Sequence, residues 1–460
     1  MITSLIRIFA ARSIRPFIFS SNNSGELDLD VKDSGLYFHI PFCKKLCPFC
    51  PYYKVEYDEG LLKDFIRALI KEIEVAAALT DKRIDIESIY FGGGSPALAI
   101  DYLPQIMASV RSLFNVRGNM GIELHPSDIN EGLLKKLKDC GFNMISIGVQ
   151  SFQDKCVAAL ERDNIDSLGK LALVKKFKFD VVDVDLIFGI PSQREEDLVR
   201  DFKTAAENGA TQISTYPFIE FSYARLKNRP LDRRQKKKML EGLMDISKKS
   251  GYTRTSIWTF SRGDSLQYSS VTRDNFIGFG PSAATLISDT FKINTFSVME
   301  YIKHFSNNAV NDNRRHIKDN GNNGDIKYFN NNKDNNIKHL NNNNENNGNN
   351  TDNKLSTALT LKFNPRARAL YWLFWSVYKL YISEDNFYEL FDKKLDNIFK
   401  VELFLAEKFG YIQRYNRGYK LTGKGAYIFH LIEQAYTRQY IDKTWRIASK
   451  NPWPERITLY

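Results

Sequence analysis

Short apolar runs alternate with amphipathic stretches from residue 36 to about residue 250. The runs are rich in β-branched and aromatic residues, and stretches such as "EGLLKDFIRALIKEIEVAAAL" between them repeat apolar residues at helical spacing. The runs span residues 36–40, 86–92, 120–124, 144–149, 180–188 and 211–218. Strand–helix repetition of this kind predicts parallel βαβ units. Because a closed (β/α) barrel needs eight units, the pattern predicts an α/β fold with an open, six-unit partial barrel.

The pattern divides the chain into four predicted segments. Residues 1–34 are an N-terminal extension, and residues 35–306 are the partial-barrel core, whose last part (251–306) is a less regular continuation. Residues 307–354 are Asn-rich and too poor in apolar side chains to offset the entropy of ordering, which predicts a disordered insertion. Residues 355–460 combine helical "ALYWLFWSVYKLY" with the hairpin-like "YIQRYNRGYKLTGKGAY". They predict a C-terminal winged-helix-like α+β domain.

Composition narrows the classes of protein that the chain can represent. The net charge is +11 over 460 residues, but the basic residues are dispersed and no aromatic–basic nucleic-acid motif occurs. No apolar run reaches the roughly 18 residues that a membrane span needs. Three of the five cysteines lie in one cluster, which excludes a secreted disulfide framework and predicts a reducing, cytoplasmic location. The Arg-containing, acid-free residues 1–25 resemble a mitochondrial transit peptide, the alternative location.

The cysteine cluster "HIPFCKKLCPFC" (39–50) directly follows the first predicted strand. Its C-x3-C-x2-C spacing can place the thiolates of Cys43, Cys47 and Cys50 around one face of a 4Fe–4S cluster, which leaves the fourth iron open to a small ligand. The alternative is a zinc site with His39 as the fourth ligand. His39 lies within the predicted strand, however, so the sheet fixes the direction of its side chain.

Further ligand-type residues come at the ends of the next predicted strands. They are the run "GGGSP" (92–96), Glu123, Gln150 and Asp185, with Arg162 shortly after the fourth strand. Glycines allow close backbone approach to a ligand, the acidic and amide groups suit an ammonium group and ribose hydroxyls, and an arginine suits a carboxylate. Since the carboxyl ends of parallel strands share one rim, these residues together predict a site for S-adenosylmethionine.

The motifs "YFHIPFCKKLCPFC", "YFGGGSP", "SIGVQSF" and "DLIFGIP" resemble the radical S-adenosylmethionine (SAM) superfamily. Within it, the chain is most similar to the oxygen-independent coproporphyrinogen III oxidase family and its heme-chaperone relatives, over about residues 35–300 and in "GYKLTGKGAY". This resemblance implies that the cluster ligands are Cys43, Cys47 and Cys50, with Phe49 at the adenine side.

The resemblance also implies the residues that hold the cofactor. Those for S-adenosylmethionine are Gly93, Gly94 and Ser95 at its methionyl end, Arg162 at its carboxylate, and Gln150 and Asp185 at its ribose. Relatives that bind a second S-adenosylmethionine use residues matching Tyr37, Glu123 and Ala284.

The implied function is reductive cleavage of S-adenosylmethionine, with a tetrapyrrole as substrate and a ferredoxin- or flavodoxin-type electron donor. The segment "SYARLKNRP" (222–230), which contains Arg225, is predicted to bind the carboxylates of such a substrate. Coproporphyrinogen oxidases carry a fourth cysteine two residues after the third, where this chain has Tyr52. The alternatives are therefore a heme-binding trafficking protein and a methyltransferase or cyclopropane-forming enzyme that shares the same core.

Overall fold

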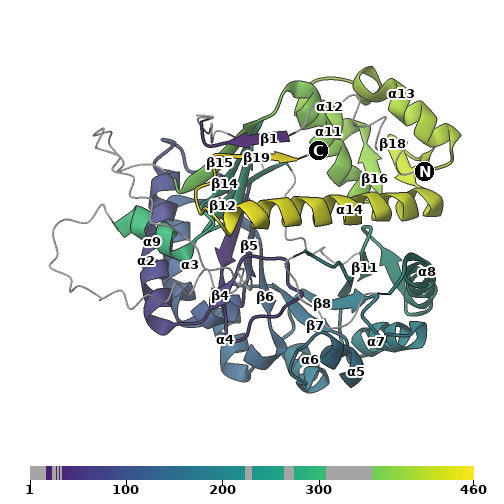
Figure 1. Ribbon diagram of the computed structural model, residues 1–460, viewed down its shortest axis with the longest axis horizontal. Helices are drawn as coiled ribbons and strands as arrows, with labels where there is room; N and C mark the ends of the chain where they lie inside the picture. Colours follow the sequence, from purple (N-terminus) through teal and green to yellow (C-terminus); the bar gives the residue numbers. More distant parts are fainter. Residues whose placement is uncertain are drawn as a thin grey trace, which may run out of the picture.

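A parallel sheet covered by helices stands at the centre of the protein, seen here in a computed structural model (Figure 1). The structure describes residues 17–22, 27, 29, 31, 34–222, 231–263, 274–306 and 355–459. The predictions for residues 1–16, for the Asn-rich residues 307–354 and for Arg225 concern parts of the chain outside these ranges.

The six predicted strands lie side by side, in chain order and parallel to one another. They are β2 (Ser34–Ile40), β5 (Asp85–Gly93), β6 (Asn115–Leu124), β7 (Met144–Gln150), β8 (Val181–Phe188) and β9 (Gln212–Pro217). The predicted α/β fold with an open partial barrel is thereby confirmed. A seventh parallel strand, β12 (Asn275–Phe279), pairs with β2 on its other side. The strand–helix pattern does not reveal β12, because no helix follows it.

Helices cover the sheet and connect its strands. Asp58, for example, begins the first of them by accepting a hydrogen bond from the backbone N–H of Leu61 (2.7 Å). The helices of the core are α2 (Glu59–Ala77), α3 (Leu103–Leu113), α4 (Glu131–Asp139), α5 (Asp154–Ala159), α6 (Ser167–Lys176), α7 (Glu195–Glu207), α8 (Arg233–Lys249) and α9 (Val298–Ser306), with 3-10 turns η1 (Pro96–Tyr102) and η2 (Pro126–Asp128). In the part of the chain that the structure describes, no helix is both long and apolar enough to cross a bilayer.

Antiparallel strands extend the sheet at both edges. Beyond β9 lie β11 (Thr259–Arg262) and β10 (Tyr252–Arg254). Beyond β12 lie, in order, β13 (Ala284–Ile287), β14 (Thr290–Asn294), β15 (Thr357–Lys362), β1 (Phe17–Ser20) and β19 (Arg456–Leu459). The first and last strands of the described chain are thus neighbours. The predicted domain boundaries at residues 34 and 355 remain a proposal; they would assign strands of one sheet to different segments.

The remaining C-terminal elements form a smaller unit beside the sheet. In chain order they are α11 (Pro365–Tyr378), β16 (Tyr381–Ser383), α12 (Glu384–Phe391), α13 (Leu395–Lys408), β17 (Ile412–Arg414), β18 (Gly418–Leu421) and α14 (Gly423–Ala448). The predicted hairpin is present as β17–β18, which forms a three-stranded sheet with β16. Figure 1 shows α14 as a long helix running between this unit and the parallel sheet.

A fully buried acid, Glu72, joins α2 to the antiparallel half of the sheet. Its Oε2 accepts hydrogen bonds from the Gly280 N–H (2.8 Å) and the Tyr301 hydroxyl (2.6 Å). Its Oε1 accepts from Asn294 Nδ2 and from the Ser356 hydroxyl, both at 2.9 Å. Burial raises the pKa of Glu72 to about 7, and the four donors oppose that rise. One carboxyl group therefore connects α2, the turn after β12, β14, α9 and the residue before β15.

Candidate active site

The three clustered cysteines lie on the loop that follows β2, where Phe42 and Cys43 pair with Val55 and Glu56. All three thiols are free and half-buried, and the Cys50 N–H donates to the Cys47 carbonyl (3.3 Å). Burial raises the pKa of Cys43 to about 12. Among the described residues, no set of three or more His, Cys, Asp or Glu side chains converges on a single metal ion. The thiolates of a 4Fe–4S cluster bind different irons, so the cysteine loop fits a cluster better than a single zinc ion.

His39, on β2, forms hydrogen bonds that fix the segment following the cysteine loop. Its Nε2–H donates to the Tyr53 carbonyl (2.8 Å), and its Nδ1 accepts from the Tyr37 hydroxyl (3.0 Å). Burial lowers the pKa of His39 to about 4, so the ring is neutral at pH 7. Because both ring nitrogens are engaged, His39 is not placed to be the fourth ligand of a zinc site. The loop is held from the other side by α14, where Trp445 Nε1 donates to the Pro51 carbonyl (2.6 Å).

The glycine run at the end of β5 packs against the same loop. Gly93 has a φ of +114°, and a Cβ at this position would lie 2.7 Å from the His39 ring. A Cβ on Gly94 would lie 2.5 Å from the Phe42 carbonyl oxygen. The close approach that these glycines allow is therefore, in part, an approach to the cysteine loop itself. Next to them, the Ser95 hydroxyl donates to Asp128 (2.5 Å).

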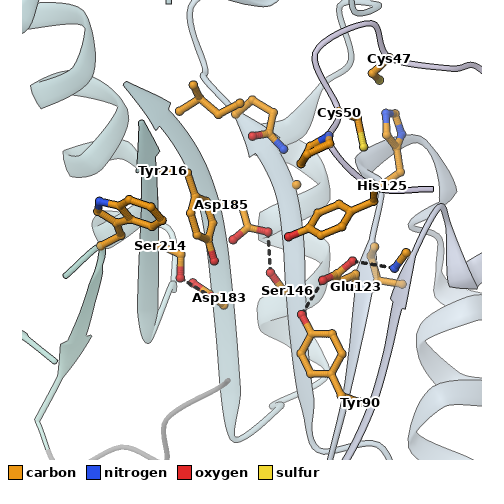
Figure 2. A pocket seen from close by; sticks show the side chains of 18 of the residues that line it. Cys47, Cys50, Tyr90, Glu123, His125, Ser146, Asp183, Asp185, Ser214 and Tyr216 are labelled. Carbon is orange, nitrogen blue, oxygen red and sulfur yellow. Dashed lines mark hydrogen bonds between the residues drawn. The ribbon is translucent and has the colours of Figure 1, made fainter. Parts of the chain in front are cut away.

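One cavity of about 980 Å³ collects most of the predicted site residues. It lies within the usual volume range of ligand pockets, at its upper end. Eleven of the thirteen predicted residues line it: Cys43, Cys47, Phe49, Cys50, Gly93, Gly94, Ser95, Glu123, Gln150, Arg162 and Asp185. Tyr37 and Ala284 are not among its lining residues. Figure 2 shows Cys47, Cys50 and His125 at one end, Ser214 and Tyr216 at the other, and Glu123 and Asp185 between them.

Polar side chains on adjacent strands are fixed by hydrogen bonds within the cavity. Glu123 accepts from the Tyr90 hydroxyl (2.6 Å) and the Gly93 N–H (3.2 Å), and Asp185 accepts from the Ser146 hydroxyl (2.8 Å). Burial raises the pKa of both acids. Gln150, at the end of β7, has a φ of +70°, a strained value for a residue other than glycine. Backbone strain of this kind is concentrated at active sites and ligand-binding sites.

Basic side chains line the cavity near the cysteines. Arg162 donates to the Gly148 carbonyl (2.8 Å), which uses one of the five N–H donors of a guanidinium group. Lys44 pairs with Asp128 (2.8 Å) and Lys45 with Asp163 (2.5 Å). This end of the cavity can therefore bind a carboxylate, as the sequence predicts for Arg162.

The far wall of the cavity consists of residues that the sequence analysis did not single out. Aromatic side chains from β9 and the segment after it, from the connection between β10 and β11, and from α11 line it: Tyr216, Phe218, Phe221, Trp258, Trp375 and Tyr378. Lys379 and Glu433 complete this wall from the C-terminal unit. Sequence offers no local signal for such a wall, because it arises from the packing of α11 and α14 against distant strands. A missed residue with a local signal is Asp183, which alternates with Asp185 in "DVD" on one face of β8.

Comparisons with known proteins show which families this chain resembles. Residues 37–205 match the family model of the radical SAM superfamily. The chain is 26% identical over 310 residues to the oxygen-independent coproporphyrinogen III oxidase of Pseudomonas aeruginosa, which covers 60% of this chain and 66% of that protein, just under two thirds. It is 26% identical over 284 residues to the heme chaperone HemW of Bacillus subtilis, covering 58% of this chain and 74% of that one.

The fold extends beyond the matched domain. The solved structure of coproporphyrinogen III oxidase (HemN) from Escherichia coli superposes with a TM-score of 0.69 at 19% identity, and covers 93% of this chain and 98% of that one. At this identity the similarity shows a shared fold, which includes the C-terminal unit.

Proposed function

We propose, from the premise that residues 37–205 form a radical SAM domain, that this chain cleaves S-adenosylmethionine reductively and acts on a tetrapyrrole. The observation that carries the proposal is the single cavity that joins the cysteine loop to the polar strand ends and the aromatic wall. Two named activities among its relatives, coproporphyrinogen oxidation and heme chaperoning, both concern tetrapyrroles.

In this proposal Cys43, Cys47 and Cys50 hold a 4Fe–4S cluster. The bound cluster would supply the electron that splits S-adenosylmethionine into methionine and a 5′-deoxyadenosyl radical. The chain's own residues bind and orient the cofactor: Arg162 its carboxylate, Gly93, Gly94 and Ser95 its methionyl end, Gln150 and Asp185 its ribose, and Phe49 its adenine. A second S-adenosylmethionine is a weaker proposal, because Tyr37 and Ala284 lie off the cavity wall.

The aromatic wall supports a broad, largely apolar substrate. Tetrapyrroles are macrocycles edged with carboxylates, and such a molecule suits aromatic side chains with a few basic groups around them. Lys379 on the wall, and Arg162 with the lysines near the cysteines, provide those basic groups. Tyr52 occupies the place of the fourth cysteine; it lines the cavity and is 52% exposed there.

Anaerobic turnover tests this proposal. Reconstituted protein with dithionite, S-adenosylmethionine and coproporphyrinogen III is expected to form 5′-deoxyadenosine and to bind the macrocycle at micromolar concentration. Because Tyr52 replaces the fourth cysteine, we expect little or no protoporphyrinogen IX, measured by mass spectrometry. Efficient double decarboxylation would overturn the expectation for Tyr52. Failure to bind any porphyrinogen, porphyrin or heme would refute the tetrapyrrole proposal.

A heme-binding role is the second candidate, and His125 favours it. His125 lines the cavity, and its hydrogen bonds to described residues all involve Nδ1, which contacts the Ser127 hydroxyl (2.7 Å) and accepts from the Ser127 N–H (3.2 Å). His39 has both ring nitrogens engaged and is therefore a poor iron ligand. His304 lies on α9 and does not line the cavity. If an axial histidine holds heme here, His125 is the described histidine best placed for it.

This candidate predicts a selective loss of heme binding. When heme is added to the purified protein, His125→Ala is expected not to show the Soret shift of the parent protein. Its affinity for heme should be lower by about tenfold or more. His304→Ala is the matched control and should bind heme as the parent protein does. A Soret shift that survives in His125→Ala would exclude His125 as the axial ligand.

The remaining partners are proposals that follow from the same site. A ferredoxin- or flavodoxin-type protein would supply the electron. We propose no nucleic-acid partner, because the exposed face of α13 carries Val401 and Phe404 rather than a row of basic residues. A cytoplasmic location is proposed as well, and the relatives compared above come from bacteria, which lends no support to the mitochondrial alternative.

A further inference from the structure

Asp183 occupies a deeper level of the cavity than the residues assigned to S-adenosylmethionine. It precedes Asp185 by two residues on β8, so both side chains point to the same face of the strand, and both line the cavity. Asp183 is the nearer of the two to the amino end of β8, away from the strand ends that carry the cysteine loop and Gln150. It is only 2% exposed.

One oxygen of the Asp183 carboxyl group has no hydrogen-bond donor of ordinary geometry in the described part of the chain. Its Oδ2 accepts from the Ser214 hydroxyl (2.8 Å) and Gln212 Nε2 (2.9 Å), as Figure 2 shows for Ser214. Its Oδ1 has no hydrogen-bond partner of ordinary geometry among the described residues, although the nearby backbone N–H groups of Val184 and Ser214 favour the ionised carboxylate. No described Lys or Arg forms an ion pair with Asp183 or Asp185. A buried acceptor left without a donor is costly, so this oxygen is suited to a donor that a ligand brings.

The residues around Asp183 determine which kind of ligand group can bind there. Asp185 and Glu123 line the same part of the cavity, and Ser88, Asn119 and Ser146 line it with short polar side chains. The basic lining residues lie elsewhere, on the cysteine loop, at Arg162 and at Lys379. Burial raises the pKa of Asp183 to about 6, and a bound hydrogen-bond donor would favour its ionised form. This part of the cavity repels carboxylates and attracts N–H donors.

We infer that Asp183 accepts hydrogen bonds from the pyrrole N–H groups of a reduced, metal-free tetrapyrrole, and so selects porphyrinogens over metal complexes. This inference rests on the proposed function and names the substrate class of its site. The saturated bridges of a porphyrinogen let its pyrrole N–H groups tilt toward one face, where a single carboxylate can accept them. A metal complex such as heme has no pyrrole N–H. The carboxylate edge of the macrocycle would face the basic residues.

Paired binding measurements test the inference. The full-length, anaerobically reconstituted protein is titrated with coproporphyrinogen III and with zinc coproporphyrin III, which carry the same carboxylates but differ in their pyrrole N–H groups and in the saturation of their bridges, so the Asp183→Asn variant isolates the contribution of the N–H groups. The parent protein is expected to bind the porphyrinogen about tenfold or more tightly than the zinc complex, the effect of a charge-assisted hydrogen bond. Asp183→Asn keeps the shape of the side chain but removes its charge, and should bring the ratio close to one.

The possible outcomes separate this inference from the proposed function. If neither macrocycle binds, the tetrapyrrole proposal fails and the inference fails with it. If both bind and the parent protein prefers the zinc complex or shows no preference, the inference alone is wrong, whatever the variant does. A preference that persists undiminished in Asp183→Asn also overturns it, because the selectivity then comes from another part of the cavity.

Discussion

Replacing any one of Cys43, Cys47 and Cys50 by alanine is expected to abolish both the iron–sulfur cluster and the formation of 5′-deoxyadenosine. The reconstituted parent protein should hold about four irons and four sulfides. Each thiolate binds a different iron, and the loop offers no fourth cysteine as a substitute, because Tyr52 stands in its place. Iron and sulfide contents are therefore expected to fall close to zero, and 5′-deoxyadenosine to fall by roughly a hundredfold or more.

Cys140 provides the matched control for these variants. It caps the C-terminal end of α4, is buried, and does not line the cavity. Cys140→Ala should keep its full iron content, and circular dichroism should show that all four variants are folded. Full iron content in each of the three loop variants would show that the cluster is bound elsewhere or not at all.

Replacing Glu72 by alanine is expected to destabilise the protein by about 3 kcal/mol or more at pH 7. The substitution leaves a cavity and four buried donors without their acceptor: the Gly280 N–H, Asn294 Nδ2 and the hydroxyls of Tyr301 and Ser356. Urea denaturation of the parent and the variant measures the difference. Glu74→Ala is the matched control on the same helix, because Glu74 is exposed and its one ion pair among the described residues is with Lys71. It should change stability by no more than about 0.5 kcal/mol.

The pH dependence of this difference gives a second measurement. The folded-state pKa of Glu72 is raised from 4.5 to about 7, so the unfolded chain releases this proton first as the pH rises. The pH-dependent stabilisation that comes from the protonated carboxyl is complete below about pH 4.5 and is lost as the pH rises to 7. Its loss lowers the free energy of unfolding of the parent protein by about 3 kcal/mol. The stability gap between the parent and Glu72→Ala should therefore narrow between pH 5 and 8. A constant gap would contradict the raised pKa.

The central sheet and the cysteine loop could be predicted because their signals are local. A buried parallel strand is a short apolar run, and each of the six predicted runs is a strand in the structure. Most of the predicted strand ends lie within two residues of the observed ones. The strand β12 and the pairing of β1 with β19 could not be predicted in this way, because strands that meet across more than 200 residues leave no periodicity in the sequence between them. Register between distant strands is decided by packing alone.

The site shows the same division between local and distant information. Residues at successive strand ends could be assigned from the sequence, because parallel strands bring their ends to one rim. Two buried acids also left a signal that the sequence analysis did not use. Asp183 shares a strand face with Asp185, and Glu72 falls on the apolar stripe of α2 between Leu69 and Ile73. An acid at an apolar position indicates a paired or functional group. The aromatic wall, by contrast, depends on how α11 and α14 dock.

The Glu72 carboxyl, together with the pairing of the first and last described strands, indicates that the chain could be circularly permuted. Tyr301, before residues 307–354, and Ser356, after them, bind the same carboxyl group, so the described parts of the chain on either side of 307–354 meet at one place. Phe17 of β1 lies opposite Leu459 of the antiparallel β19, so a short hairpin turn could join these two strands. A circularly permuted chain, opened within 307–354 and closed from β19 to β1, would keep every strand pairing of the sheet and both wall-forming helices.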